Sequence, residues 1–335
     1  MQVIHNQSLK EYNTFGIDVR AKKFIEVSTV EDLKKILRKT YSEELFILGG
    51  GSNMLLTQDI EKTVLRINIK GKEVLEEIND KVIIKAHAGE NWHEFVLWTL
   101  KQNFGGLENL SLIPGNVGTS PIQNIGAYGV ELKDVFISCE AINIQTLEIE
   151  TFTLADCEFD YRNSIFKNQL KDQYIITSVN FELTTKNHQL KMDYGAIKTE
   201  LQNISSPTIQ DISKAIVNIR QNKLPNPAEI GNSGSFFKNP IITVDFFSEL
   251  KKKYPEIHGY QLNDNEIKVP AGWLIDNAGL KGYRDGDAGI HKKQALVLVN
   301  YGTASGSDIL KLSIKIRNIV KEKFGIDLET EVNII

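Results

Sequence analysis

The chain has 335 residues, of which 41% are hydrophobic and 24% charged, and its formal net charge is −4. Acidic and basic residues are intermixed, so no basic stripe indicates nucleic acid binding and no acidic tail indicates a disordered arm. The two cysteines, Cys139 and Cys157, are too few for a disulfide framework or a thiolate metal cluster. The length predicts two or three domains. Neither a signal peptide nor a run of about 18 apolar residues is found, which predicts a cytoplasmic protein without a membrane span.

The first part of the chain predicts a β-α-β unit. Thr29, followed three residues later by Asp32, has the pattern of a helix N-cap. The expected strands are residues 24–27, 45–48 and 54–56.

A glycine turn, Gly49–Gly51, separates the last two of these strands. A dinucleotide fingerprint starting at Gly49 needs glycine where Met54 stands, and no Gly-Lys-Ser/Thr follows, so the Rossmann and P-loop signatures both fail. With polar Ser52 and Asn53 behind it, the turn is equally compatible with a phosphate site and with a purely structural role.

Strands are expected at residues 63–67 and 81–88. Asn91 with Glu94 three residues later indicates a helix that stops before Gly105. The stretch that follows, residues 109–129 (NLSLIPGNVGTSPIQNIGAYG), holds four glycines and two prolines and no apolar period. Such long loops in compact domains are usually functional or disordered, and the apolar content favours a folded loop. Glycine permits close approach, and successive backbone amides form anion-binding nests. A tightly turned structural loop is the alternative.

The remaining elements are predicted from periodicity and caps. A hairpin is expected over residues 135–152, a strand over 174–183, a polar insertion over 191–201 and a helix from Thr208 with Asp211. Pro225 and Pro227 end that helix and mark a domain boundary. Further helices are expected at residues 244–254, 271–278 and 307–324, and strands at 295–300 and 328–334.

Three polar positions stand out as candidates for chemistry: Tyr161 with Arg162, Ser235, and Glu331. Ser235 does not lie in a G-x-S-x-G nucleophile elbow. Arg162 suits a bidentate carboxylate, although a structural pair with Tyr161 is the alternative. His87, His93, His188 and His291 lack metal-ligand spacing and are interpreted as ordinary surface or core residues, so no metal site is predicted.

Long segments of the chain resemble the UDP-N-acetylenolpyruvoylglucosamine reductase family. They fall in the family's order from residue 13 to the C-terminus: NTFGI, LGGGSN, IPGNVGTSPIQNIGAYG, FDYRNSIFK, KLPNP, GNSGSFFKNP, PAGWLIDNAGLKG, HKKQALVLVN and EVNII. The insertion with Tyr194 resembles the longer subtype of the family.

The resemblance implies an α/β (α+β) fold of the vanillyl-alcohol-oxidase type, in which two α/β subdomains hold FAD and a third α+β domain binds substrate. The expected domains are residues 1–67 with the C-terminal strand 326–335, residues 68–219, and residues 220–325. FAD would lie against the two glycine loops, which contain no His or Cys, so its binding is expected to be non-covalent. The implied cofactor-binding residues are Gly49, Gly50, Gly51, Ser52, Asn53, Pro114, Gly115, Gly118, Thr119, Gln123, Asn124, Gly126, Ala127, Tyr128, Tyr161 and Arg220.

The implied reaction is the reduction of UDP-N-acetylglucosamine enolpyruvate to UDP-N-acetylmuramate, a step of peptidoglycan precursor synthesis and hence of cell wall biogenesis, cell shape and cell division. NADPH reduces FAD and leaves, flavin N5 then delivers hydride to C3, and Ser235 protonates C2. Arg162 and Glu331 polarise the substrate carboxylate, where negative charge develops. The missing Rossmann motif agrees with NADPH sharing the sugar-nucleotide site.

By the same resemblance, Tyr194 and Lys223 would contact the diphosphate of the substrate, and Asn239 and Gln294 the UDP moiety. The chain departs from the family at Ser233, where alanine is more common. It also departs at Thr119-Ser120, which replaces smaller residues. Little consequence is expected from either, because both are expected to act mainly through backbone, although Ser233 could perturb the pocket around Ser235.

Two rival functions remain. A flavin oxidase of the same fold would lack the combination of Arg162, Ser235 and Glu331, and a catalytically silent UDP-sugar or flavin-binding regulator would have a broken catalytic set. The reductase is expected to be a cytoplasmic monomer that binds neither nucleic acid nor membrane.

Overall fold

The computed structural model describes residues 2–335, which form two compact units. The first unit contains the described residues up to Gln7, Ala21–Gly50 and Ile60–Arg220. The second contains Ser8–Arg20, Gly51–Asp59 and Gln221–Ile335. The chain therefore crosses between units within the first glycine turn, between Gly50 and Gly51. The expected division into three domains stays a prediction.

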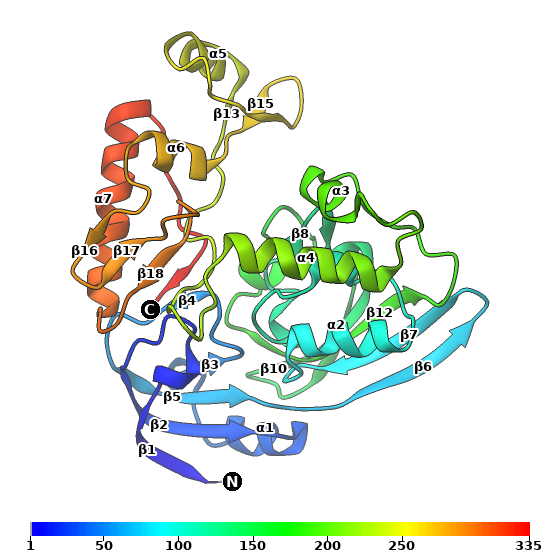
Figure 1. Ribbon diagram of the computed structural model, residues 1–335. Helices are drawn as coiled ribbons and strands as arrows, with labels where there is room; N and C mark the ends of the chain where they lie inside the picture. Colours follow the sequence, from blue (N-terminus) through cyan, green and yellow to red (C-terminus); the bar gives the residue numbers. More distant parts are fainter. Residues whose placement is uncertain (1) are drawn as a thin grey trace. The chain divides into compact units, whose positions relative to one another are not determined.

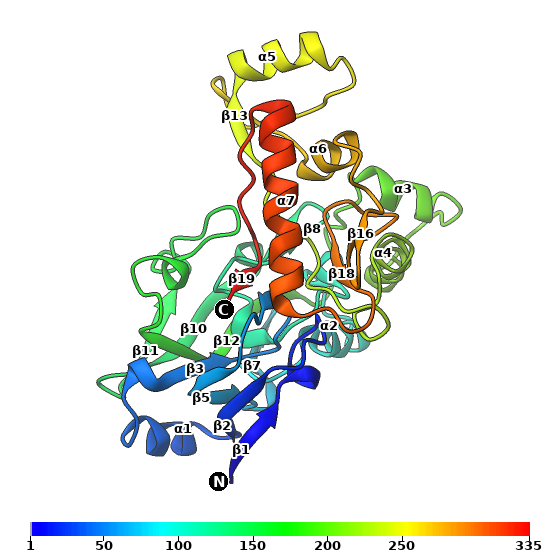
Figure 2. The same ribbon diagram turned by 90° about the vertical axis from the view of Figure 1, so that its left-hand side faces the viewer.

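The first unit begins with a four-stranded sheet in the order β1-β2-β5-β3. Strands β2, β3 and β5 run parallel, as a β-α-β connection through helix α1 requires. Helix α1 lies against this sheet (Figure 2). Thr29 accepts a hydrogen bond from the Asp32 amide and so caps α1. The bounds are β1 Val3–Ser8, β2 Arg20–Val27, α1 Val30–Leu37, β3 Leu45–Leu48 and β5 Ile60–Ile67.

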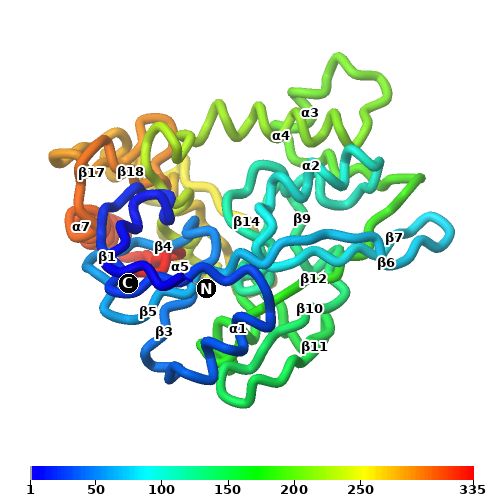
Figure 3. The backbone as a smooth tube through the Cα atoms, turned by 90° about the horizontal axis from the view of Figure 1, so that it is seen from below, coloured from blue at the N-terminus to red at the C-terminus, as the bar shows by residue number. Residues whose placement is uncertain are grey.

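A five-stranded antiparallel sheet in the order β11-β10-β12-β7-β6 forms the rest of the first unit. Strands β6 and β7 form a long hairpin side by side, as Figure 3 shows. The bounds are β6 Lys72–Ile78, β7 Lys81–His87, β10 Phe136–Asn143, β11 Ile149–Thr153 and β12 Tyr174–Thr184, with the short pair β8 Gly126–Ala127 and β9 Val130–Glu131.

Helices α2 (Trp92–Lys101), α3 (Gly195–Leu201) and α4 (Ile209–Lys223) complete the first unit, α4 passing its last three residues to the second (Figure 1). The aromatic rings of α2 pack onto the antiparallel sheet, where the Phe95 and Phe181 centroids are 5.1 Å apart. A separate small core joins α3 to α4 through Ile197, Ile212 and Ile216. This burial of apolar surface holds α3 in place, because a seven-residue helix is marginal by itself.

The second unit is built from small sheets around helix α7. Two three-stranded antiparallel sheets have the orders β13-β15-β14 and β16-β17-β18, and β4 pairs with β19 in parallel. After α7 the chain returns alongside the helix to its C-terminus (Figure 2). The bounds are β4 Met54–Leu55, β13 Ile241–Thr243, α5 Val244–Lys253, β14 Tyr260–Gln261, β15 Glu266–Lys268, α6 Ala271–Asn277, β16 Arg284–Asp285, β17 Ala288–Ile290, β18 Leu298–Asn300, α7 Gly306–Phe324 and β19 Asn333–Ile334.

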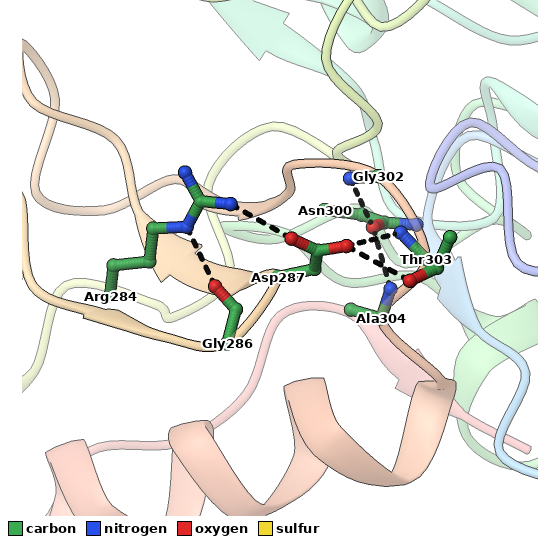
Figure 4. Close-up of polar contacts among 7 residues, drawn as sticks. All are labelled: Arg284, Gly286, Asp287, Asn300, Gly302, Thr303 and Ala304. Atoms are coloured by element: carbon green, nitrogen blue, oxygen red, sulfur yellow. Dashed lines mark hydrogen bonds and ion pairs between the residues drawn. The ribbon is translucent and has the colours of Figure 1, made fainter.

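A polar corner joins β18 to α7, and Figure 4 shows its contacts. The buried Asn300 side chain accepts from the amides of Gly302 and Ala304, both at 3.0 Å, and donates to the Phe15 carbonyl at 3.1 Å. Asp287 accepts from the amide and hydroxyl of Thr303 and pairs with Arg284 at 2.8 Å. The side chains of this corner thus provide hydrogen-bond partners for backbone groups that lie outside helices and sheets.

Most of the predicted elements are confirmed, and several short strands that were not expected are present, among them β1 and β13–β17. Three further differences concern β6, the insertion and the C-terminus. Residues 72–78 form a strand where none was expected, because β6 is an edge strand with exposed apolar side chains and carries no clean alternation. The insertion at 191–201 contains helix α3. The C-terminal strand is limited to Asn333–Ile334, since residues 328–332 pair only through the single bridge of Thr330 with Phe237.

We expect Asn300→Ala to lower the stability of the protein by about 2 kcal/mol or more, because it leaves two amides and one carbonyl without their partner. The measurement is the thermal or urea unfolding transition, with the exposed Arg317→Ala variant on α7 as control. An unfolding transition equal to that of the control would show that water replaces the Asn300 contacts at no cost.

Candidate functional site

The loop of residues 109–129 runs along the segment that enters helix α2. The amides of Gly118 and Val117 donate to the carbonyls of Ala88 and Glu90 at 3.0 and 2.9 Å, and the Trp92 amide donates to the Gly115 carbonyl at 3.0 Å. It contains no α-helix, only 3-10 turns such as Val117–Thr119 and very short strands. The predicted folded, irregular loop is therefore confirmed.

Several residues of this region adopt left-handed backbone conformations. Leu112, Asn124 and Tyr128 have φ of 59°, 43° and 51° within the loop, and Arg162 has φ of 54°. Such conformations are strained for residues other than glycine and concentrate at functional sites. The surrounding contacts must therefore hold the strained backbone in place.

The two glycine loops meet with no room for a side chain. A Cβ on Gly50 would lie 2.7 Å from the Gly115 Cα, and one on Gly49 would lie 2.4 Å from the Thr119 Cγ2. A Cβ on Gly118 would lie 2.4 Å from the Ala88 Cβ. Backbone packed this closely can present amides to an anion, as a dinucleotide diphosphate requires. The residues present therefore fit FAD.

The Asn124 side chain forms hydrogen bonds within the protein. It is fully buried, accepts from the Lys133 amide at 3.1 Å and donates to Glu131 and to the Asp160 carbonyl. Its amide is therefore occupied within the protein, and it joins the glycine loop to the segment that carries Arg162.

Arg162 lies beside the end of the glycine loop. Its Nη2 donates to the Gly126 carbonyl at 2.8 Å, and its guanidinium lies 5.7 Å from the Tyr161 ring centroid. Arg220, on α4, hydrogen-bonds Tyr128, and burial together with the charge of Arg162 lowers the pKa of Arg220. Two guanidiniums in one partly buried region attract an anionic group.

Tyr128 connects Arg220 to the insertion. Its ring meets that of Tyr194 edge-on at 5.2 Å, and burial raises the pKa of Tyr128. Tyr194 precedes α3 and is half exposed. The first unit thus brings together Tyr128, Arg162, Arg220 and Tyr194 next to the glycine loop.

In the second unit Ser235 and Glu331 lie on neighbouring extended segments. The Glu331 amide donates to the Phe236 carbonyl at 2.8 Å, and Ser235 bridges Val297 on its other side. Phe236, fully buried, anchors the segment. Within residues 2–335 the Ser235 hydroxyl makes no hydrogen bond. It is therefore available to a ligand.

Ser233 acts through its side chain, contrary to the expectation that backbone would dominate. The side chain is buried, and its Oγ lies 3.2 Å from the Thr14 Oγ1 and donates to the Met54 carbonyl at 3.2 Å. Alanine here would lose both contacts. Ser233 therefore connects the segment of Ser235 to the chain that follows the first glycine turn.

That same chain reaches Glu331 through Asn53. The Asn53 side chain donates to the Glu331 carbonyl at 3.2 Å, and the Asn53 carbonyl accepts from Asn333. Asn53 and Met54, which follow the glycine turn, thus bond the two segments that carry candidate catalytic residues of this unit.

The expected substrate residues of the second unit divide into two groups. Asn239 accepts from the Ala271 amide at 2.9 Å, and the Gln294 side chain lies beside Gly272, so both meet at the start of α6. Lys223 is exposed at the end of α4, apart from them in the sequence.

The arrangement of metal-ligating side chains and of the two cysteines can be described for residues 2–335. No group of three His, Cys, Asp or Glu side chains there is arranged to hold a metal ion. Cys139 and Cys157 are buried free thiols, and the hydrogen bond between them raises the pKa of Cys139. No helix in residues 2–335 is long and apolar enough to cross a membrane.

Comparisons with known proteins agree with these observations. A family model described as UDP-N-acetylenolpyruvoylglucosamine reductase, C-terminal domain, matches residues 226–335, and one described as FAD binding domain matches residues 21–150. The UDP-N-acetylenolpyruvoylglucosamine reductase of Flavobacterium johnsoniae is 59% identical over 337 residues, covering 100% of both chains. That of Pseudomonas putida is 47% identical over 98% of this chain and 97% of its own.

A solved structure of the same description, from Thermus caldophilus, aligns with a TM-score of 0.69 at 24% identity, covering 99% of this chain and 98% of that one. At this identity the similarity bears on the fold. Together with the FAD binding domain match, it confirms the expected α/β flavoprotein fold class.

We expect Gly50→Ala to lower the FAD content of the purified protein at least tenfold, because the added Cβ would push the two glycine loops apart. The measurement is the flavin absorbance per chain and the affinity for added FAD. Gly195→Ala is the control, since a Cβ there meets nothing within 4 Å. Full flavin content in Gly50→Ala would show that FAD binding does not need this close approach.

Proposed function

Because the chain belongs to the UDP-N-acetylenolpyruvoylglucosamine reductase family, we propose that it reduces UDP-N-acetylglucosamine enolpyruvate to UDP-N-acetylmuramate. FAD is its bound cofactor and NADPH its reductant. The observation that supports this most directly is the Ser235 hydroxyl, which is left without a hydrogen bond beside the segment of Glu331. Such a hydroxyl is poised to serve a ligand and contributes no bond of its own to the fold.

The cofactor is held by backbone. Gly49, Gly50 and Gly115 carry no side chain, so their backbone can approach a diphosphate closely and offer amides to it. When bound, FAD would supply the redox chemistry that carries a hydride from the reductant to the substrate. The loops of residues 49–53 and 114–129 contain no His or Cys, so we propose that FAD binds there without a covalent link. Denatured enzyme should therefore release free FAD.

The substrate carries two anionic parts, and each has candidate cations. Arg162 binds the carboxylate of the enolpyruvyl group, for which a guanidinium provides two parallel donors. Lys223 and Tyr194 hold the diphosphate, and Asn239 and Gln294 hold the UDP moiety. Tyr161 and Arg220 shape the region around Arg162 and Tyr128.

Proton transfer is the task of Ser235. Addition of hydride at C3 leaves a strongly basic centre at C2, and the Ser235 hydroxyl gives it a proton. A serine hydroxyl is a weak acid, so it suits only a centre this basic. Arg162 lowers the barrier by stabilising the negative charge that spreads onto the carboxylate. Glu331 assists only when it carries a proton or a hydrogen bond, since a bare carboxylate would repel that charge.

The biological setting follows from the reaction. UDP-N-acetylmuramate is a precursor of peptidoglycan, so the enzyme serves cell wall synthesis, and with it cell shape and division. We place it in the cytoplasm as a monomer. A flavin oxidase of the same fold and a silent nucleotide-binding regulator are the rival functions.

The visible spectrum separates these functions. The purified protein should show a flavin spectrum that bleaches with anaerobic NADPH and recovers on addition of the enolpyruvyl substrate. Bleaching without recovery would support a flavoenzyme but would reject the enolpyruvyl sugar nucleotide as its substrate. A colourless protein that FAD cannot reconstitute would favour the regulator.

We expect Ser235→Ala to slow substrate reduction by about 100-fold or more, the usual contribution of a positioned acid. Flavin bleaching by NADPH should remain near the wild-type rate, because that half-reaction needs no proton at C2. Ser248→Ala is the matched control, since that hydroxyl is exposed and bonds only the Val244 carbonyl. Equal loss of both half-reactions in Ser235→Ala would rule out the proton-donor role.

A further inference from the structure

His93, on the first turn of helix α2, contacts the glycine loop through its ring. Its Nδ1 accepts a hydrogen bond from the Leu112 amide at 2.9 Å. A ring nitrogen that accepts a hydrogen bond carries no proton, so the neutral ring has its proton on Nε2. A doubly protonated ring would lose the acceptor. The contact therefore exists only while His93 is neutral.

Leu112 needs this contact more than an ordinary residue would. Its φ of 59° is unfavourable for a leucine, which gains nothing from the left-handed conformation. The same end of α2 holds the loop at two more points, where the Trp92 indole donates to the Leu110 carbonyl and the Trp92 amide donates to the Gly115 carbonyl. Of these three contacts, only that of His93 titrates near neutral pH.

The loop segment that these three contacts hold, residues 110–115, ends where the two glycine loops meet. Gly115 lies three residues after Leu112, and its Cα faces Gly50 with no room for a Cβ. A change of backbone at Leu112 would therefore alter the approach of Gly115 to Gly50.

We propose that His93 is a positioning residue for FAD, whose neutral Nδ1 fixes Leu112 and, through it, the Gly115 backbone of the cofactor cradle. FAD affinity then falls as His93 is protonated. This inference rests on the proposed placement of FAD against the glycine loops.

The charged groups around His93 influence the pH range over which its ring is protonated. Glu94 follows it on α2, Arg220 acts on it from α4, and Lys101 and Lys214 line the groove between these helices beside it. Burial lowers the pKa of His93 most, Arg220 lowers it further and Glu94 raises it.

The sign of the pH dependence follows from this direction. The folded-state pKa lies below the ordinary value of about 6.5, so the contact is intact above that value. It is lost as the pH falls from about 6.5 through the folded-state pKa. FAD affinity should change in the same direction.

Two variants test the proposal. His93→Leu removes the acceptor and keeps an apolar side chain, and it should weaken FAD binding about tenfold at pH 7.5, the effect of one lost hydrogen bond. His93→Asn keeps an acceptor oxygen that does not titrate, so it should bind FAD nearly as the wild type does and lose the pH dependence. FAD affinity is measured by fluorescence titration of the apoprotein between about pH 5 and 8, the range in which histidine titrates.

Amide hydrogen exchange at Leu112 provides a second measurement without FAD. Exchange should be faster in His93→Leu than in the wild type and nearly unchanged in His93→Asn, with thermal melting to show that each variant is folded. Unchanged exchange and unchanged FAD affinity in His93→Leu would overturn the proposal. Faster exchange with unchanged FAD affinity would also overturn it, and would leave the proposed function intact. Wild-type apoprotein that binds no FAD would instead overturn the proposed function.

Discussion

The close approach of two glycine loops is the constraint on which the FAD-binding unit depends. Gly50 and Gly115 leave no space for a side chain between their backbones, and the rest of the unit holds them in that position. The parallel strands β3 and β5 present the first loop at a strand end. Helix α2, anchored by aromatic rings on the antiparallel sheet, presents the second. Buried side chains and backbone hydrogen bonds hold the second loop in its strained backbone conformation.

The candidate chemical groups follow from this arrangement in each unit separately. In the first unit, the chain that leaves the glycine loop brings Gly126 to Arg162, and α4 adds Arg220, so positive charge collects beside the cofactor cradle. In the second unit, extended segments set Ser235 near Glu331 and leave the serine hydroxyl free. Arg162, the proposed cation, and Ser235, the proposed proton donor, are thus each held by contacts within their own unit.

Local signals predicted much of the fold because they act within a few residues. Thr29 and Asn91 cap their helices through the amides three residues later, and Gly325 ends α7 in the left-handed conformation. Strand β6 and helix α3 were missed for the opposite reason. β6 is stabilised by its ladder with β7, and α3 by apolar contacts with α4, so neither is visible in its own residues. His93 was read as an ordinary histidine because its partner, Leu112, lies far along the chain.

The amino-acid sequence by itself determined the residue types, the caps, the glycine positions and, through long motifs, the family. Spacing alone could not say which side chains meet, because contacts between distant residues depend on how sheets and helices pack. Only the tertiary structure decided that Asn124 is occupied inside the protein, that Ser233 bonds Met54 and Thr14, and that His93 holds Leu112. These contacts join residues from different segments, and they form only after apolar burial has brought those segments together.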